Sequence, residues 1–190
     1  MKHEKGLRVS MYLILIALVV IYVSIAVAIL INDWFSWKKN ALSDLGGPYS
    51  ENPYVFNIGL ILGGLLAIPF PAFLSEHFRS PVSRLGSLLA SLGLFFLVLI
   101  GLFPEGTRLH YPSSWAFFMT MFLSILVMGF GLLLEKRIGE GFFGILLAIF
   151  SFFLAVGNQC MSTALREIVG ALSITTWLLY WDYRLFVEKD

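Results

Sequence analysis

The sequence predicts an all-α fold: a polytopic membrane protein, built as a six-transmembrane-helix bundle that forms a single domain over residues 1–190. Its composition, its long uncharged segments and the placement of its basic residues support this prediction. Hydrophobic residues make up 58% of the chain and charged residues only 13%. Soluble domains carry about 25% charged residues, and a chain of this size could not shield so much apolar surface from water.

The predicted spans follow from the uncharged runs between charged residues. A helix needs about 20 apolar residues to cross about 30 Å of hydrocarbon. Runs of this kind predict spans at about 9–32, 54–75, 84–103, 111–134 and 141–157. The last uncharged run, 168–181, is too short to cross the membrane by itself. We therefore expect a sixth span at about 164–187 that carries charged residues near its ends. The polar residues 158–163 before it are expected to form a turn. Pro69 and Pro71 should kink or end the second span.

Basic residues predict the orientation, because cytoplasmic loops carry an excess of Lys and Arg. With the N-terminus inside, the inner side holds most of them and the outer side only Lys38, Lys39, Arg108 and Arg166. We therefore expect a multi-pass protein of the cell membrane in the N-in/C-in orientation. Aromatic residues near the ends of the first and last spans are expected in interfacial belts: Trp34, Phe35 and Trp37 after the first, and Trp177, Tyr180, Trp181 and Tyr183 at the end of the last.

The net charge and the spacing of small residues indicate which binding partners to expect. A net charge of +1 gives no basic face for nucleic acid, so membrane lipids are the expected partners. Ser83, Ser87 and Ser91 recur at spacing four beside Gly86 and Gly93, a pattern that lets helix backbones approach closely. It predicts packing inside one bundle, and a homo-oligomer is the alternative.

Unusual polar residues gather on the predicted outer side. Ionisable groups at membrane depth are costly, so they tend to face a cavity or pair together. His110 comes shortly before Pro112, so it is expected at the N-terminal end of a span, where the helix dipole disfavours an imidazolium. The candidate polar pocket consists of Ser43, Asp44, Glu105, His110 and Glu167, with Arg108 and Arg166 as candidate anion-binding residues.

Several interpretations of these residues stay open. Carboxylates and imidazole suit Mg, Mn or Zn, so Asp44, Glu105, His110 and Glu167 are also candidate ligands of a divalent metal, the one cofactor considered. More simply, Asp44 could cap the second span or bond loop amides, and Glu105 could pair with Arg108. The function indicated is binding or processing of lipid headgroups or a related amphiphile. A small transporter and a structural or accessory subunit without catalysis are the alternatives, and an enzymatic role is left undecided.

Two motifs carry a resemblance to a known family. The segment Asn-Ala-Leu-Ser-Asp-Leu-Gly at 40–46, followed by Phe56-Asn57-Ile-Gly59, is the first, and Gly101-Leu-Phe-Pro-Glu105 with His110 is the second. They resemble the signatures of a six-span membrane family called domain of unknown function 998. The chain is also distantly similar to a group that includes the damage-regulated autophagy modulators and the Golgi proteins that remodel the lipid of GPI anchors. That similarity implies a role in handling lipids. It extends to four residues only: Ser43, Asp44, Gly46 and His110.

Overall fold

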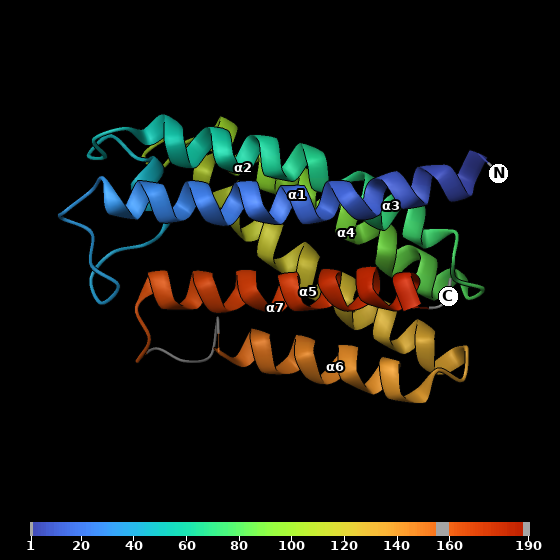
Figure 1. Cartoon of the computed structure of the whole chain (residues 1–190). Helices are drawn as coiled ribbons and strands as arrows, with labels where there is room; N and C mark the ends of the chain where they lie inside the picture. Colours follow the sequence, from blue (N-terminus) through green and yellow to red (C-terminus); the bar gives the residue numbers. More distant parts are fainter. Residues whose placement is uncertain (1, 155–159, 188–190) are drawn as a thin grey trace.

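A computed structural model describes residues 2–154 and 160–187. Figure 1 shows the long helices aligned along one axis, with the start of α1 and the end of α7 at the same end of the bundle. We call this end the terminal end, and we call the opposite end, which holds residues 31–52, 103–109 and 160–162, the loop end. The elements are α1 (Lys2–Leu30), the 3-10 helix η1 (Ser43–Gly46), α2 (Pro53–Ala67), α3 (Pro69–Ser75), α4 (Pro81–Leu102), α5 (His110–Leu134), α6 (Ile138–Phe152) and α7 (Thr163–Val187).

Helices occupy the positions predicted for the spans. Four segments of the described chain are long and apolar enough to cross a membrane: Glu4–Leu30, Pro53–Ser75, Pro81–Leu102 and His110–Leu134. Their outer surfaces carry exposed large apolar side chains, which indicates a membrane protein. α6 is apolar but shorter, and α7 carries charges near both ends. Residues 155–157 of the predicted fifth span, and Asn158 and Gln159 of the predicted turn, lie outside the described residues.

The second span is broken where its prolines predicted. α2 ends at Ala67 and α3 begins at Pro69, because proline has no N–H for the helical hydrogen-bond ladder. Serine side chains of α4 bond the carbonyl groups around this break. Ser91 Oγ donates to Ile68 O at 3.1 Å and Ser87 Oγ to Pro71 O at 2.7 Å. Two of the regularly spaced serines of α4 therefore hold the kinked segment against the bundle.

The small residues of α4 bring it into close contact with α5. A Cβ atom on Gly86 would lie 2.5 Å from Met128 N, which is closer than real contacts allow. Ser124 Oγ of α5 donates to Gly86 O at 2.7 Å across the same contact. The small-residue stripe therefore packs helices inside the chain, as the sequence predicted, and these positions are not free for a second copy.

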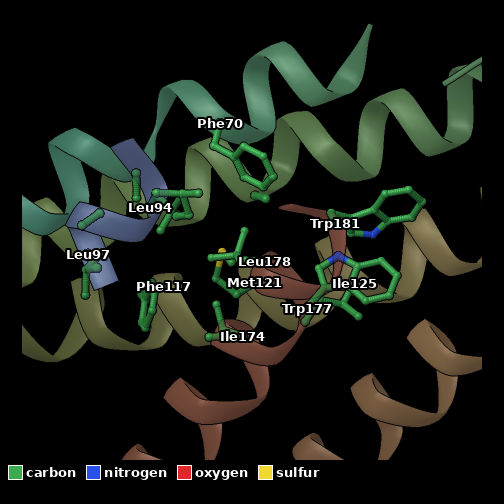
Figure 2. Packing of buried hydrophobic residues seen from close by; sticks show 14 of the residues in the cluster. Phe70, Leu94, Leu97, Phe117, Met121, Ile125, Ile174, Trp177, Leu178 and Trp181 are labelled. Atoms are coloured by element: carbon green, nitrogen blue, oxygen red, sulfur yellow. The ribbon is translucent and has the colours of Figure 1, made fainter. Parts of the chain in front are cut away.

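Aromatic residues hold α7 at the terminal end, where the prediction that Trp177 and Trp181 belong to an interfacial belt is wrong. Trp177 and Trp181 are 2% and 0% exposed, and Figure 2 shows both rings in the core beside Ile125. Phe78 meets Trp181 edge-on, with the ring centroids 4.8 Å apart. Arg137 Cζ lies 4.9 Å from the Trp181 ring centroid, within the range of a cation–π contact. The helix turns these indoles inward, so they anchor α7 instead of facing headgroups.

Candidate functional site: a polar pocket at the loop end

The first loop is closed by an asparagine that sequence reasoning did not single out. Asn32 is 1% exposed, and its Nδ2 donates to Ala28 O at 2.7 Å. Its Oδ1 accepts from Glu51 N at 2.8 Å and from Trp34 Nε1 at 3.0 Å. One side chain thus joins the end of α1 to both ends of the loop. These hydrogen bonds fix both ends of the first loop, which contains η1.

The Ser-Asp-Leu-Gly segment forms η1, and its aspartate organises the loop itself. Asp44 Oδ2 accepts from Ala41 N at 2.9 Å and from Asn40 Nδ2 at 3.3 Å. Asp44 therefore bonds loop amides, one of the two alternatives from the sequence. It does not cap the second span, because the residue at that cap position is Asn52.

Gly46 of η1 packs directly against the side chain of Asn57 in α2. Asn57 Nδ2 of α2 donates to Gly46 O at 2.9 Å, and a Cβ atom on Gly46 would lie 2.3 Å from Asn57 Oδ1. Gly101 of α4 lies on the other side, where a Cβ atom would come 2.5 Å from Asn57 O. Residues from both sequence motifs therefore meet around Asn57, and glycine is required where η1 and α4 approach it.

Glu105 and His110 form the central pair of the site. Glu105 Oε2 lies 2.8 Å from His110 Nε2 and accepts from Ser43 Oγ at 3.2 Å. Glu105 therefore bonds Ser43 and His110, and the alternative of pairing with Arg108 is wrong. His110 is the first residue of α5, so Pro112 stands within its first turn. The predicted position of the histidine at a helix N-terminus is confirmed.

The hydrogen bonds of His110 determine where its proton sits. Nδ1 lies 2.9 Å from Phe103 O, and a carbonyl oxygen only accepts, so Nδ1 carries a proton. Nε2 faces both Glu105 Oε2 and Ser114 Oγ, the latter at 3.3 Å. The contact between Nε2 and Oε2 needs one proton between them, from either partner. Glu105 and His110 are therefore hydrogen-bonded to each other in the wall of the pocket.

Glu167 joins the start of α7 to the first loop. It lies near the start of α7, just past the first turn, and its Oε2 accepts from Leu42 N at 2.5 Å. Beside it, Ala164 N donates to Asn40 O at 3.0 Å. These bonds bring a residue distant in sequence against η1, so that Glu167 faces the same space as Glu105.

The predicted pocket residues line one cavity at the loop end, with a volume of about 410 Å³. Ser43, Asp44, Glu105, His110 and Glu167 all contribute to its wall, as does Arg166. Arg108 is exposed and does not line it. Of the two candidate anion-binding residues, the structure places only Arg166 at this site.

An aromatic and apolar face of α5 completes the wall, and sequence reasoning missed it. Tyr111, Trp115, Phe118 and Phe122 follow His110 at helical spacing and line the same cavity, with Ser114 and Met119 between them. The rings of Tyr111 and Trp115 meet edge-on, with the centroids 6.1 Å apart. The period of a helix could have revealed this face, because its rings recur from Tyr111 every three or four residues.

Arg166 holds an unused donor next to the cavity. Its Nη2 donates to Thr163 Oγ1 at 3.2 Å, whereas its Nε is buried without a hydrogen-bond partner. Buried guanidinium donors are rarely left unpaired, since each costs free energy. The unused donor indicates that an acceptor, such as an oxyanion, belongs there.

The divalent-metal alternative finds no ligand set in the described residues. Within them, no group of three or more His, Cys, Asp or Glu side chains has the arrangement of a metal site. Asp44 and Glu167 direct carboxylate oxygens to backbone amides of the first loop. The pocket is therefore built from separate polar contacts around a cavity.

The fold and the site together define a helical membrane protein with a partly aromatic polar pocket at one end. A family model described as "Protein of unknown function (DUF998)" matches residues 15–181. The chain belongs to this DUF998 family, as the two sequence motifs predicted. Comparisons with curated proteins and with solved structures gave no match.

Proposed function

We propose that this protein crosses the cell membrane six times, with both ends in the cytoplasm, and uses its outward-facing pocket to bind the headgroup of a membrane lipid. The excess of basic residues at the terminal end supports this orientation. The shared end of α1 and α7 is consistent with an even number of spans (Figure 1).

The observation that carries the proposal is the gathering of five predicted polar residues around one cavity at the loop end. Three of them, Asp44, Glu105 and Glu167, are carboxylic acids, and Arg166 is the single guanidinium in the wall. A ligand complementary to this wall carries a positive group toward the acids and a negative group toward the arginine. An ammonium and a phosphate on one headgroup meet both requirements.

The aromatic face of α5 supports the same class of ligand. Trp115 and Tyr111 stand beside the acids, and an ammonium group is attracted to the faces of such rings. The unpaired Arg166 Nε offers its hydrogen to a phosphate oxygen, which arginine binds well. A zwitterionic phospholipid headgroup thus fits the charges and rings of the wall.

Glu105→Gln tests the acidic part of the pocket. Glutamine keeps the size of the side chain and can still hydrogen-bond in its place, but it removes the carboxyl group. We expect the affinity of the purified chain for short-chain lysophosphatidylethanolamine to fall about tenfold, the size of a lost charged hydrogen bond. Binding measured by calorimetry should show little change for lysophosphatidic acid, which lacks the ammonium group. Glu51→Gln, the same change at an exposed residue of the first loop, is the control.

Arg166→Gln tests the anion contact, and exposed Arg108→Gln is its matched control. The Arg166 variant should weaken binding of both lipids, because both contain phosphate, and the Arg108 variant should weaken neither. If the wild-type chain binds neither lipid, the proposal is wrong.

A structural role is the second candidate, and specific bonds favour it. Asp44, His110 and Glu167 each bond a backbone group of a loop, as expected of side chains that hold loops together. In that case Glu105→Gln and Arg166→Gln would lower the melting temperature and leave lipid affinity unchanged. A transporter finds less support, since the space that adjoins the pocket inside the bundle is mostly apolar.

A further inference from the structure

A narrow crevice adjoins the polar pocket inside the bundle. It has a volume of about 90 Å³, compared with about 410 Å³ for the pocket. Four residues line both spaces, so the two adjoin each other there, at what we call the mouth of the crevice. These residues are Ser43, Ser114, Phe118 and Glu167.

The lining of the crevice is almost entirely aliphatic and aromatic beyond this mouth. α1 contributes Ile14, Leu18, Ile21 and Ile25, and α7 contributes Ala171, Ile174 and Leu178 opposite them. The deeper hydroxyl groups, those of Tyr22 and Thr175, are hydrogen-bonded to each other at 2.8 Å. An apolar cavity of this kind does not hold water, and it offers nothing that would bind an ion or a sugar.

The depth of the crevice corresponds to one leaflet of a membrane. Along α7 its lining runs from Glu167 to Leu178, and along α1 from Ile25 to Ile14. Each stretch advances eleven residues, which is about 16 Å at the rise of an α-helix. Half of the hydrocarbon core of a bilayer is about 15 Å thick. An acyl chain that starts at the headgroup level would therefore end where the crevice ends.

We infer that one acyl chain of the bound lipid enters this crevice while its headgroup occupies the polar pocket. This inference rests on the proposed function. The pocket accounts for the headgroup of the lipid, and the inference gives the acyl chain a binding site of its own. A crevice of about 90 Å³ has room for no more than one chain, so a second chain would remain in the surrounding bilayer. Protein interiors are normally filled to crystal-like density, so an open apolar space among α1, α2, α4, α5 and α7 is a place where an apolar chain can pack.

Ala171 offers the cleanest way to fill the crevice. It is half-buried on the wall formed by α7, four residues beyond Glu167. Ala171→Phe places a ring across the path of the chain, about one helical turn from Glu167, and leaves the Glu105, His110 and Arg166 side chains unchanged. Ala26→Phe is the control, because Ala26 is exposed on α1 four residues before that helix ends.

The experiment measures binding of lysophosphatidylethanolamines with acyl chains from butanoyl to tetradecanoyl to the full chain in detergent. The result is the ratio of wild-type to variant affinity at each length, because partition into the micelle is the same for both proteins. Each methylene that loses its place in the crevice should weaken binding about fourfold. We expect a ratio near one for butanoyl that rises beyond about tenfold for the long chains.

The outcomes separate the inference from the proposed function. If the ratio stays near one at every length while Glu105→Gln still weakens binding, the crevice inference is wrong and headgroup binding stands. If wild-type protein binds none of the lipids, both fail. A rise for Ala26→Phe equal to that for Ala171→Phe would also overturn the inference. Ala171→Leu should give a smaller rise and serves if the phenylalanine variant does not fold.

Discussion

Between α4 and α5 the backbones approach so closely that a methyl group on Gly86 would strike Met128, whereas α7 faces α1 across a crevice wide enough to remain open. In lipid, helices gain no hydrophobic free energy by associating, so close packing depends on small residues and hydrogen bonds. α4 and α5 have both. Opposite α1, α7 presents the branched side chains Ile174 and Leu178 and the hydroxyl of Thr175.

α7 itself is held in two different ways along its length. At the terminal end Trp177 and Trp181 are packed in the core, and Arg137 lies over the second indole. At the loop end Glu167 bonds the first loop, and between these two anchors the wall of α7 borders the crevice. A helix anchored at both ends with a space beside its middle can admit a chain without losing its position.

The largest effect is expected at the terminal anchor. Trp181→Ala should lower the free energy of unfolding by about 3 kcal/mol or more, because it leaves a large cavity and removes the ring beneath Arg137. Unfolding in mixed detergent micelles, followed by circular dichroism, measures the change. Phe186→Ala, at an exposed position on the same helix, should change stability little. Equal losses for the two variants would show that the indole is not an anchor.

An intermediate effect is expected where packing is closest. Gly86→Ala should cost about 1–3 kcal/mol, since the added methyl group meets backbone atoms of α5 that cannot rotate away. Gly139→Ala provides the contrast, because a Cβ atom there meets nothing within 4 Å and alanine is the better helix former. The two melting temperatures should move in opposite directions. A Gly86 variant as stable as the wild type would contradict the close contact between α4 and α5.

The smallest effect is expected across the crevice. Tyr22→Phe removes the hydrogen bond to Thr175, which joins α1 to α7, at a cost of about 0.6 kcal/mol, the average for such bonds in membrane proteins. Hydrogen exchange followed by mass spectrometry should rise in the middle of α7 and stay unchanged in α4 and α5. A uniform rise through the bundle would mean that α7 is no more loosely held than the other helices.

Much of the fold could be predicted from the sequence because its signals are local. Pro69 and Pro71 remove backbone donors wherever they stand, so the break between α2 and α3 followed from them directly. The partners of the site residues were harder to predict. Glu105 was equally able to reach Arg108 or His110 from its loop, and only the path of that loop directs it to Ser43 and the imidazole.

The sequence by itself determined the class of this protein, the positions of its helices and the end of the bundle at which its polar residues gather. These depend on hydropathy and chain connectivity, which act over a few neighbouring residues or along one span. The tertiary structure decided which faces turn inward. It buried Trp177 and Trp181, left Arg108 outside, brought the aromatic face of α5 to the pocket and left the crevice open beside α7. Those outcomes depend on how helices distant in sequence rotate and pack against one another, which no local pattern specifies.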